Sequence, residues 1–147
     1  MEKNLGMIDV GAKEITKRVA RARVIVQLNR ELIDKIKNNT IPKGNVLEIS
    51  RIAGIMAAKR TAEILPLCHN IEIECVDIEF TIGEEGLEIE SSVRASAKTG
   101  VEMEALTACS AAALTIYDMC KMFSKSIEIK ELFLIEKRGG KSGVYRR

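Results

Sequence analysis

Two charged residues near the end of one helical stretch have the types and the spacing for acid–base chemistry. Residues 99–121 predict a single long helix because, after the opening Thr99-Gly100, they contain neither proline nor glycine. Asp118 and Lys121 are three residues apart, so they share a face of this helix. A carboxylate beside an ammonium group stays ionised and can accept a proton, although such a pair is more often a solvated helix end.

Other residues that could move protons, and a loop lysine that could supply positive charge, lie at the start of this helix and in two connecting segments. Glu102 and Glu104 open the helix, His69 follows a helix stop at a turn, and Lys43 lies in a Pro-x-Gly loop. Turns and loops commonly display functional side chains. Further cations that could neutralise a phosphorylated ligand are Arg18, Lys59, Lys121, Lys137 and Lys141.

Alternating apolar residues predict the strands that must position these groups. They cover residues 18–28, 71–82, 87–98 and 126–137, with a turn at 83–86. In the second strand the alternation slips by one residue near Cys75-Val76, which indicates a β-bulge there.

Three helices are expected between the strands, over residues 29–39, 45–65 and 99–121. Asn45 is a plausible N-cap for the second helix, and Pro66 ends it. That helix has an apolar stripe, made of Ile49, Ile52, Ala53 and Met56. The middle of the last helix is rich in alanine, and small side chains let another backbone approach closely.

The element order without the first helix is βαββαβ, which predicts an α+β, ferredoxin-like fold with a four-stranded antiparallel sheet. We expect one domain over residues 1–147, with an N-terminal arm at 1–14 and a flexible basic tail at 138–147. The exposed sheet face is expected to carry several apolar residues. This face and the alanines suggest contacts with other copies of the chain.

Composition excludes some partners and indicates a cytoplasmic protein. The net charge of +2 is too small to imply nucleic acid or a membrane surface, and no apolar run could span a bilayer. The N-terminus lacks the apolar segment of a signal peptide. The four cysteines are scattered and form no CxxC pair, so free thiols are expected rather than a zinc site or a disulfide framework.

Three function classes fit a fold of this type, and the residues favour one of them modestly. RNA binding needs aromatic stacking residues, yet the chain has no tryptophan, three phenylalanines and two tyrosines. A regulatory module that binds a metabolite would not need the Asp–Lys pair, the turn histidine and the loop lysines. An enzyme acting on a phosphorylated small molecule would use all of them.

Long stretches of the sequence resemble the MoaC family, the cyclic pyranopterin monophosphate synthases of molybdenum cofactor biosynthesis. They are PKGNV, RIAGIMAAKRTAEILPLCHN, KTGVEMEALTACSAAALTIYDMCK and GGKSG, and the resemblance runs from about Met7 to Gly143. Two positions depart from the family pattern. Gly11 stands where the family usually has serine, and Asn70 stands where it usually has proline.

The resemblance implies a lyase-type reaction and an assembly. Members convert 3′,8-cyclo-7,8-dihydroguanosine triphosphate, which derives from GTP, into cyclic pyranopterin monophosphate and release pyrophosphate. A radical SAM enzyme acts one step upstream. The family forms homohexamers, trimers of dimers, with active sites at subunit interfaces. No cofactor and no protein-bound metal are expected, and magnesium assistance is left as an alternative.

The resemblance also assigns roles to residues of this chain. The catalytic aspartate matches Asp118, its lysine partner Lys121, and the loop lysine Lys43. Positions that bind substrate match Leu67, Cys68, His69, Met103 and Glu104, and polar pocket positions match Glu102, Lys137 and Lys141. We expect Arg18, Lys59 and His69 to contact the triphosphate and Cys68 to serve in packing. Glu102 or Glu104 could instead recognise the guanine-derived edge, because ionised carboxylates only accept hydrogen bonds.

Overall fold

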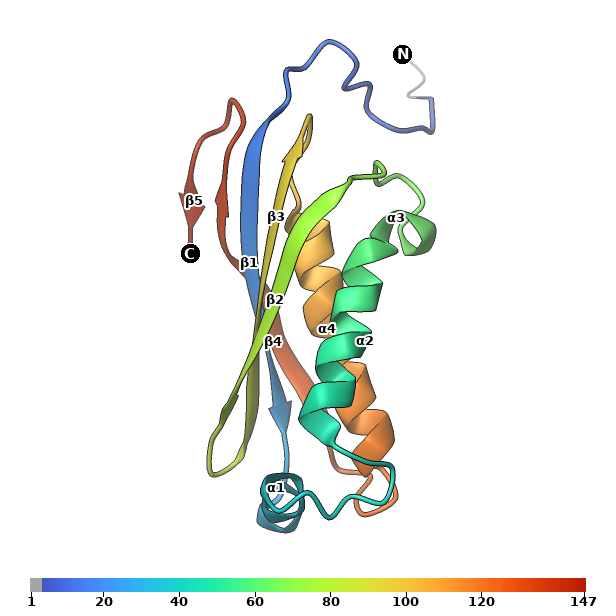
Figure 1. Ribbon diagram of the computed structural model, residues 1–147, viewed down its shortest axis with the longest axis vertical. Coiled ribbons are helices and arrows are strands. Elements are labelled where there is room, and N and C mark those ends of the chain that lie inside the picture. Colours follow the sequence, from blue (N-terminus) through green and yellow to red (C-terminus); the bar gives the residue numbers. More distant parts are fainter. Residues whose placement is uncertain (1–3) are drawn as a thin grey trace.

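A single sheet with helices packed on one of its faces makes up the chain, as the computed structural model of residues 4–147 describes it (Figure 1). Residues 1–3 of the expected N-terminal arm lie outside this range. The elements are β1 (Thr16–Gln27), α1 (Arg30–Lys37), α2 (Val46–Lys59), α3 (Thr61–Ile64), β2 (Ile73–Ile82), β3 (Gly86–Ala97), α4 (Glu102–Cys120), β4 (Glu128–Arg138) and β5 (Tyr145–Arg146).

The strand order is β2-β3-β1-β4-β5, and every neighbouring pair is antiparallel. Its first four strands have the ferredoxin-like order, so the predicted α+β fold class is confirmed. The sheet has five strands rather than four because Tyr145 and Arg146, in the basic tail, pair with β4. The long helices α2 and α4 run side by side on one face of the sheet (Figure 1).

Strict alternation along β1 separates the core from the outer face of the sheet. Ala20, Ala22, Val24 and Val26 are fully buried beneath the helices. The alternate positions of β1 carry the charged residues Arg21 and Arg23 and also the half-buried apolar residues Val19 and Ile25, so the apolar residues expected on this face lie there beside charged ones. The ion pairs of this face are Arg21–Glu90, Arg21–Glu136, Arg23–Glu88 and Arg94–Asp77.

Local signals in the sequence account for the bulge and the helix starts. The register of β2 against β3 shifts between Ile73 and Cys75, which confirms the predicted bulge near Cys75-Val76. The side chain of Asn45 accepts a hydrogen bond from the backbone N–H of Glu48 at 3.1 Å, which confirms it as the N-cap of α2. Asn29 caps α1 in the same way through the N–H of Leu32.

The helix expected over residues 45–65 is broken in two at Arg60. Its φ and ψ angles, −116° and 15°, are not helical, and α2 ends there while α3 begins at Thr61. The buried hydroxyl of Thr61 donates to the carbonyl oxygens of Ala57 and Ala58. A hydroxyl that bonds back to helix carbonyls competes with the regular backbone ladder, which propensity alone does not reveal.

Helix α2 buries the small residues Ser50, Gly54 and Ala58, whereas several of its large apolar residues face outward. A Cβ added at Gly54 would lie 2.9 Å from the carbonyl oxygen of Ala108 and 3.5 Å from Cβ of Ala112, so the helices approach closely at this glycine. The alanines of α4 therefore serve packing within the chain. The predicted stripe faces away from the sheet instead, with Ile52 57% exposed. None of the helices formed by residues 4–147 has the length and apolar content needed to cross a bilayer.

Candidate functional site

The carboxylate of Asp118 lies between two lysine side chains at the C-terminal end of α4. Lys43 Nζ is 3.1 Å from Oδ2 and also donates to the backbone carbonyl of Asp118 at 3.0 Å. Lys121 Nζ is 3.0 Å from Oδ1. We call these three residues the Asp118 cluster. It unites all three residues predicted to be catalytic, including one from a distant part of the sequence.

The loop between α1 and α2 brings Lys43 to the cluster. Ile41 is buried and fixes the loop to the core, and the N–H of Gly44 donates to the carbonyl of Ile41 at 3.1 Å. The φ angle of Gly44 is +122°, a conformation that side chains disfavour. The glycine therefore permits the tight turn that presents Lys43 to the end of α4.

The two lysines keep the Asp118 carboxylate charged. The hydrogen bond from Lys121 lowers its pKa most, followed by the hydrogen bond and the charge of Lys43. The side chains are open to solvent, at 56% for Asp118 and 40% for Lys43. Exposed ion pairs contribute little to stability, so the convergence of two cations on one carboxylate indicates a chemical role better than a structural one.

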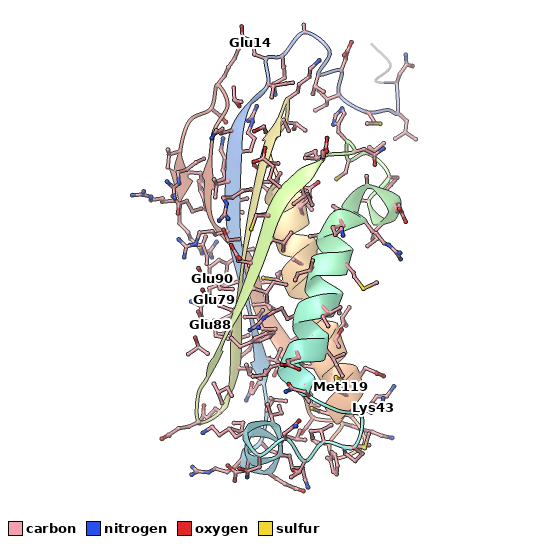
Figure 2. All side chains as sticks on the ribbon, viewed as in Figure 1. Glu14, Lys43, Glu79, Glu88, Glu90 and Met119 are labelled. Carbon is pink, nitrogen blue, oxygen red and sulfur yellow. The ribbon has the colours of Figure 1, made fainter. Side chains whose placement is uncertain are left out.

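A second group of predicted residues lines a pocket of about 470 Å³ at the opposite end of the molecule. We call it the arm pocket, because residues 6–13 form one wall of it. From the other elements it is lined by Leu67, Cys68, His69, Ile71, Thr99, Gly100, Glu102, Met103 and Glu104. Figure 2 labels Lys43 near one end of the molecule and Glu14, at the end of the arm, near the other.

His69 connects this pocket to the arm. Its Nε2 lies 2.7 Å from the carbonyl oxygen of Ile8. A carbonyl oxygen only accepts hydrogen bonds, so Nε2 carries the proton in this contact. The expected arm thus contributes a backbone group to the ring that was predicted to contact substrate. Residues 4–15 form no helix or strand.

Burial changes the acidity of two groups in the arm pocket. Glu104 is buried, and desolvation raises the pKa of its carboxyl, with a smaller contribution from the charge of Glu102. Burial also raises the pKa of the Cys68 thiol, and the charge of Glu104 adds to this effect. A thiol that stays protonated is a poor nucleophile, which fits the expected packing role of Cys68.

A second hollow of about 390 Å³ adjoins the arm pocket, and we call it the tail cavity. It is lined by Arg18, by Gly140 and Lys141 of the C-terminal tail, and by Ala12, Lys13, Glu14 and Thr16. Lys13 lines both hollows and was not among the predicted residues. In the sequence, Lys13 is only one lysine of the N-terminal arm. It reaches the site because of the path that the arm takes in the folded structure.

The remaining predicted residues lie outside these groups. Lys59 is the last residue of α2 and is exposed. Lys137 is on β4, where its ammonium group donates to the hydroxyl of Ser142. Within one chain Glu104 and Asp118 are also far apart, because fourteen residues of α4 span roughly 21 Å.

Metal-binding groups do not converge in the part of the chain that the structure describes. Within residues 4–147 no three His, Cys, Asp or Glu side chains are close enough together to hold a metal ion. The four cysteines are all free, with Cys109 and Cys120 buried and Cys68 and Cys75 half-buried. The absence of a required cofactor and the alternative of magnesium assistance both stay predictions.

Comparisons with known proteins identify relatives over nearly the whole chain. Residues 7–140 match the sequence profile described as the MoaC family. A protein of Peptoclostridium acidaminophilum named cyclic pyranopterin monophosphate synthase is 53% identical over 141 residues, 96% of this chain and 90% of that protein. One of the same name from Staphylococcus carnosus is 52% identical over 147 residues, 98% and 91% of the two chains. Molybdenum cofactor biosynthesis protein 1 of Drosophila melanogaster is 51% identical over 142 residues, 95% of this chain and 25% of that longer protein.

Proposed function

The chain belongs to the MoaC family, and from this membership we propose that it is a cyclic pyranopterin monophosphate synthase of molybdenum cofactor biosynthesis. The proposed substrate is 3′,8-cyclo-7,8-dihydroguanosine triphosphate, and the products are cyclic pyranopterin monophosphate and pyrophosphate. The observation that carries the proposal is the Asp118 cluster. Lys43 comes from a loop and Lys121 from the C-terminal end of α4, and both contact the Asp118 carboxylate. This carboxylate is exposed to solvent, so burial does not explain why it has two cationic partners.

Each part of the proposed reaction has chemically suitable groups. Rearranging a purine into a pyranopterin moves protons among several nitrogens and oxygens. Asp118 accepts them as an ionised carboxylate, and Lys43 and Lys121 donate hydrogen bonds to it or to the substrate. Glu104 has a raised pKa and therefore holds a proton more readily than an ordinary glutamate. This supports a proton-donor role, whereas the alternative of recognising the guanine-derived edge needs the ionised carboxylate that only accepts hydrogen bonds.

Forming the cyclic phosphate requires positive charge around the leaving group. A ribose-derived oxygen bonds to the α-phosphorus while the bond to the bridging oxygen breaks, and pyrophosphate leaves with its negative charge. We assign Arg18, Lys59 and His69 to the triphosphate, with Lys137 and Lys141 as further pocket cations. Arg18 and Lys141 line the same tail cavity, which supports the assignment of both residues to phosphate binding.

We propose in addition that the active site is assembled between subunits of a homohexamer, a trimer of dimers. Two observations support this assembly. Glu104 and Asp118 are too far apart on one rigid helix to flank the same reacting ring. The outward stripe of α2, with Ile49, Ile52 and Met56 exposed, is apolar surface of the kind that subunit contacts bury.

The same proposal includes the pathway context expected from the sequence. A radical SAM enzyme one step upstream would supply the cyclised nucleotide. The proposal also includes a cytoplasmic location, with no binding to nucleic acid and no attachment to a membrane.

The decisive experiment is an assay with the purified protein and the cyclised nucleotide. Pyrophosphate is measured enzymatically, and the pterin is measured as its fluorescent oxidised derivative. We expect equal amounts of the two products, with GTP itself left unchanged. The Asp118→Asn protein is the matched control, because it keeps the shape of the side chain and removes its charge.

The outcomes separate the function from its alternatives. Formation of both products by the wild-type protein alone supports the proposal. An unchanged nucleotide, together with tight binding of an RNA or of another metabolite, would contradict it and favour a binding module.

A further inference from the structure

Arg18 is a buried cation without a neutralising carboxylate among the described residues 4–147. Its side chain is on the inner face of β1, and the residue is only 6% exposed. Among residues 4–147, no carboxylate lies within ion-pair distance of its guanidinium. Nη2 donates to the carbonyl of Lys98 at 3.1 Å, whereas the buried Nε finds no partner in that part of the chain. Burying such a charge is costly unless a ligand supplies the opposite charge.

The guanidinium is covered by the backbone of the C-terminal tail. At Gly140 an added Cβ would lie 2.7 Å from Cζ and 3.0 Å from Nη2 of Arg18, and it would overlap Nη1. At Gly139 an added Cβ would lie 3.0 Å from Cδ of Arg18 and would overlap the carbonyl oxygen of Lys17. Both glycines have positive φ angles, +101° and +78° in chain order. The tail can therefore lie flat on Arg18 only where it has no side chain.

This cover fixes the direction of the guanidinium. The Lys98 carbonyl holds one nitrogen, and the Gly140 backbone blocks one side of the planar group. The group borders the tail cavity, to which two cations, Lys13 and Lys141, and one carboxylate, Glu14, also contribute. A rigid, planar fork of donors recognises phosphate oxygens best when its orientation is set in advance.

We propose that Gly140 is a positioning residue for Arg18, one whose missing side chain holds the guanidinium ready for a phosphate group in the tail cavity. The inference rests on the proposed function, because it takes Arg18 as a contact for the triphosphate and the pyrophosphate. It adds a role for the tail backbone: a side chain at residue 140 displaces the guanidinium and weakens phosphate binding without touching the reacting ring.

The test compares Gly140→Ala with Gly143→Ala. Gly143 has a φ of +70°, close to that of Gly140, but an added Cβ there has nothing within 4 Å. The two substitutions therefore introduce a similar backbone strain, and only one of them meets Arg18. Binding of inorganic pyrophosphate is measured by titration calorimetry, and KM and kcat are measured with the cyclised nucleotide.

We expect Gly140→Ala to weaken pyrophosphate binding and raise KM by about tenfold or more, since an oriented charge-assisted contact is lost. Its kcat should stay within about threefold of wild type, because binding is affected more than chemistry. Gly143→Ala should stay near wild type in all three. Equal effects of the two substitutions would overturn the proposal and point to strain of the tail.

A double-substitution cycle shows whether Gly140 acts through Arg18. In an Arg18→Ala background, Gly140→Ala should have no further effect on pyrophosphate binding. A full additional loss there would overturn the positioning role. If Arg18→Ala alone leaves binding and KM unchanged, the assignment of Arg18 to the triphosphate fails. If Arg18→Ala loses binding while Gly140→Ala matches its control, only the positioning role fails.

Folding is controlled by circular dichroism and by a second pair of variants. Asparagine adopts positive φ angles more readily than alanine, so Gly140→Asn and Gly143→Asn reduce the backbone strain and keep the added Cβ. We expect Gly140→Asn to weaken pyrophosphate binding and Gly143→Asn to leave it near wild type. Equal binding by these two variants would contradict the proposal.

Discussion

Asp118 has one lysine on each carboxylate oxygen, and this arrangement determines its charge state. Lys121 is in the position that helix geometry dictates, three residues after Asp118 at the C-cap of α4, whereas Lys43 comes from a separate loop. The sequence alone predicts the first pair from spacing, and the family resemblance added the loop lysine. The contact of Lys43 with the backbone carbonyl of Asp118 had no signal in the sequence, because it depends on how the loop at Gly44 turns.

Replacing Asp118 by asparagine should abolish turnover and preserve the fold. The amide keeps the size of the side chain but can neither accept a proton nor carry charge, so we expect kcat to fall by roughly 10²–10⁴-fold, the usual contribution of a general acid–base group. Thermal unfolding and the size of the assembly should match wild type. Near-normal turnover would contradict the catalytic assignment, whereas loss of the assembly would indicate a structural role.

The titration of Asp118 should depend on both Lys121 and Lys43. The pKa of Asp118 is lowered in the folded protein, so its interactions stabilise the fold above the ordinary aspartate pKa, and this contribution is lost as pH falls through the lowered value. Carbon NMR of the carboxyl should show the pKa rising in both Lys121→Met and Lys43→Met. An unchanged pKa in both variants would show that neither lysine holds the carboxylate in solution.

At the scale of elements, the sequence predicted the strands well and the orientation of α2 poorly. Alternation defines β1 and β3 because one face of each strand is buried, and the slip near Cys75 defines the bulge. Apolar periodicity gave the right helix for α2 but not its direction, since large apolar residues lie among Glu48, Arg51 and Lys59 on the exposed side. The size of the side chains determines which face of α2 is buried, because only the face with Gly54 lets α2 lie against the alanines of α4.

Substituting Gly54 by alanine tests this close packing of helices. Alanine favours helix over glycine by about 1 kcal/mol, so an unconstrained site would be stabilised. Here the new methyl group overlaps Cδ1 of Ile78 and lies 2.9 Å from the Ala108 carbonyl oxygen. We expect a net loss of about 1–3 kcal/mol in the free energy of unfolding, measured with urea.

The variant Ile78→Val provides the matched control for this substitution. It removes the Cδ1 atom that the new methyl group would meet, so part of the loss should be recovered in the double variant. A stabilising effect of Gly54→Ala alone would show that the helices have room to separate.

At the scale of the whole molecule, the groups of the proposed site lie at opposite ends of one chain. The Asp118 cluster is near the end with α1, and the arm pocket is near the end with α3 (Figures 1 and 2). The separation of Glu104 from Asp118 follows from their spacing in the sequence, because helix rise per residue is fixed. The sequence could not anticipate that the arm and the tail adjoin at Lys13, since neither segment has a regular pattern.

Mixed assemblies of two inactive variants should regain activity. If each pocket takes Glu104 from one subunit and Asp118 from another, random mixing of Glu104→Ala and Asp118→Ala chains restores roughly one pocket in four. The two proteins are unfolded together, refolded and assayed for pyrophosphate release. Mixed assemblies that form, as mass spectrometry of the intact oligomers can establish, but stay inactive would contradict the shared pocket.

The position of β2 at the end of the strand order also bears on colloidal behaviour. β2 pairs with β3 on one side, and no strand of residues 4–147 lies on its other side, so its backbone could template fibrillar association with further chains. Exposed carboxylates at Glu74, Asp77 and Glu79 make such an approach electrostatically unfavourable, and the bulge near Cys75 distorts the edge. We therefore expect the exposed carboxylates of β2 to protect the protein from precipitation, because they repel another chain that approaches this edge. Replacing Glu74 and Glu79 by glutamine should leave the unfolding temperature nearly unchanged while light scattering at high protein concentration increases, and clear solutions of this variant would assign the protection to the bulge.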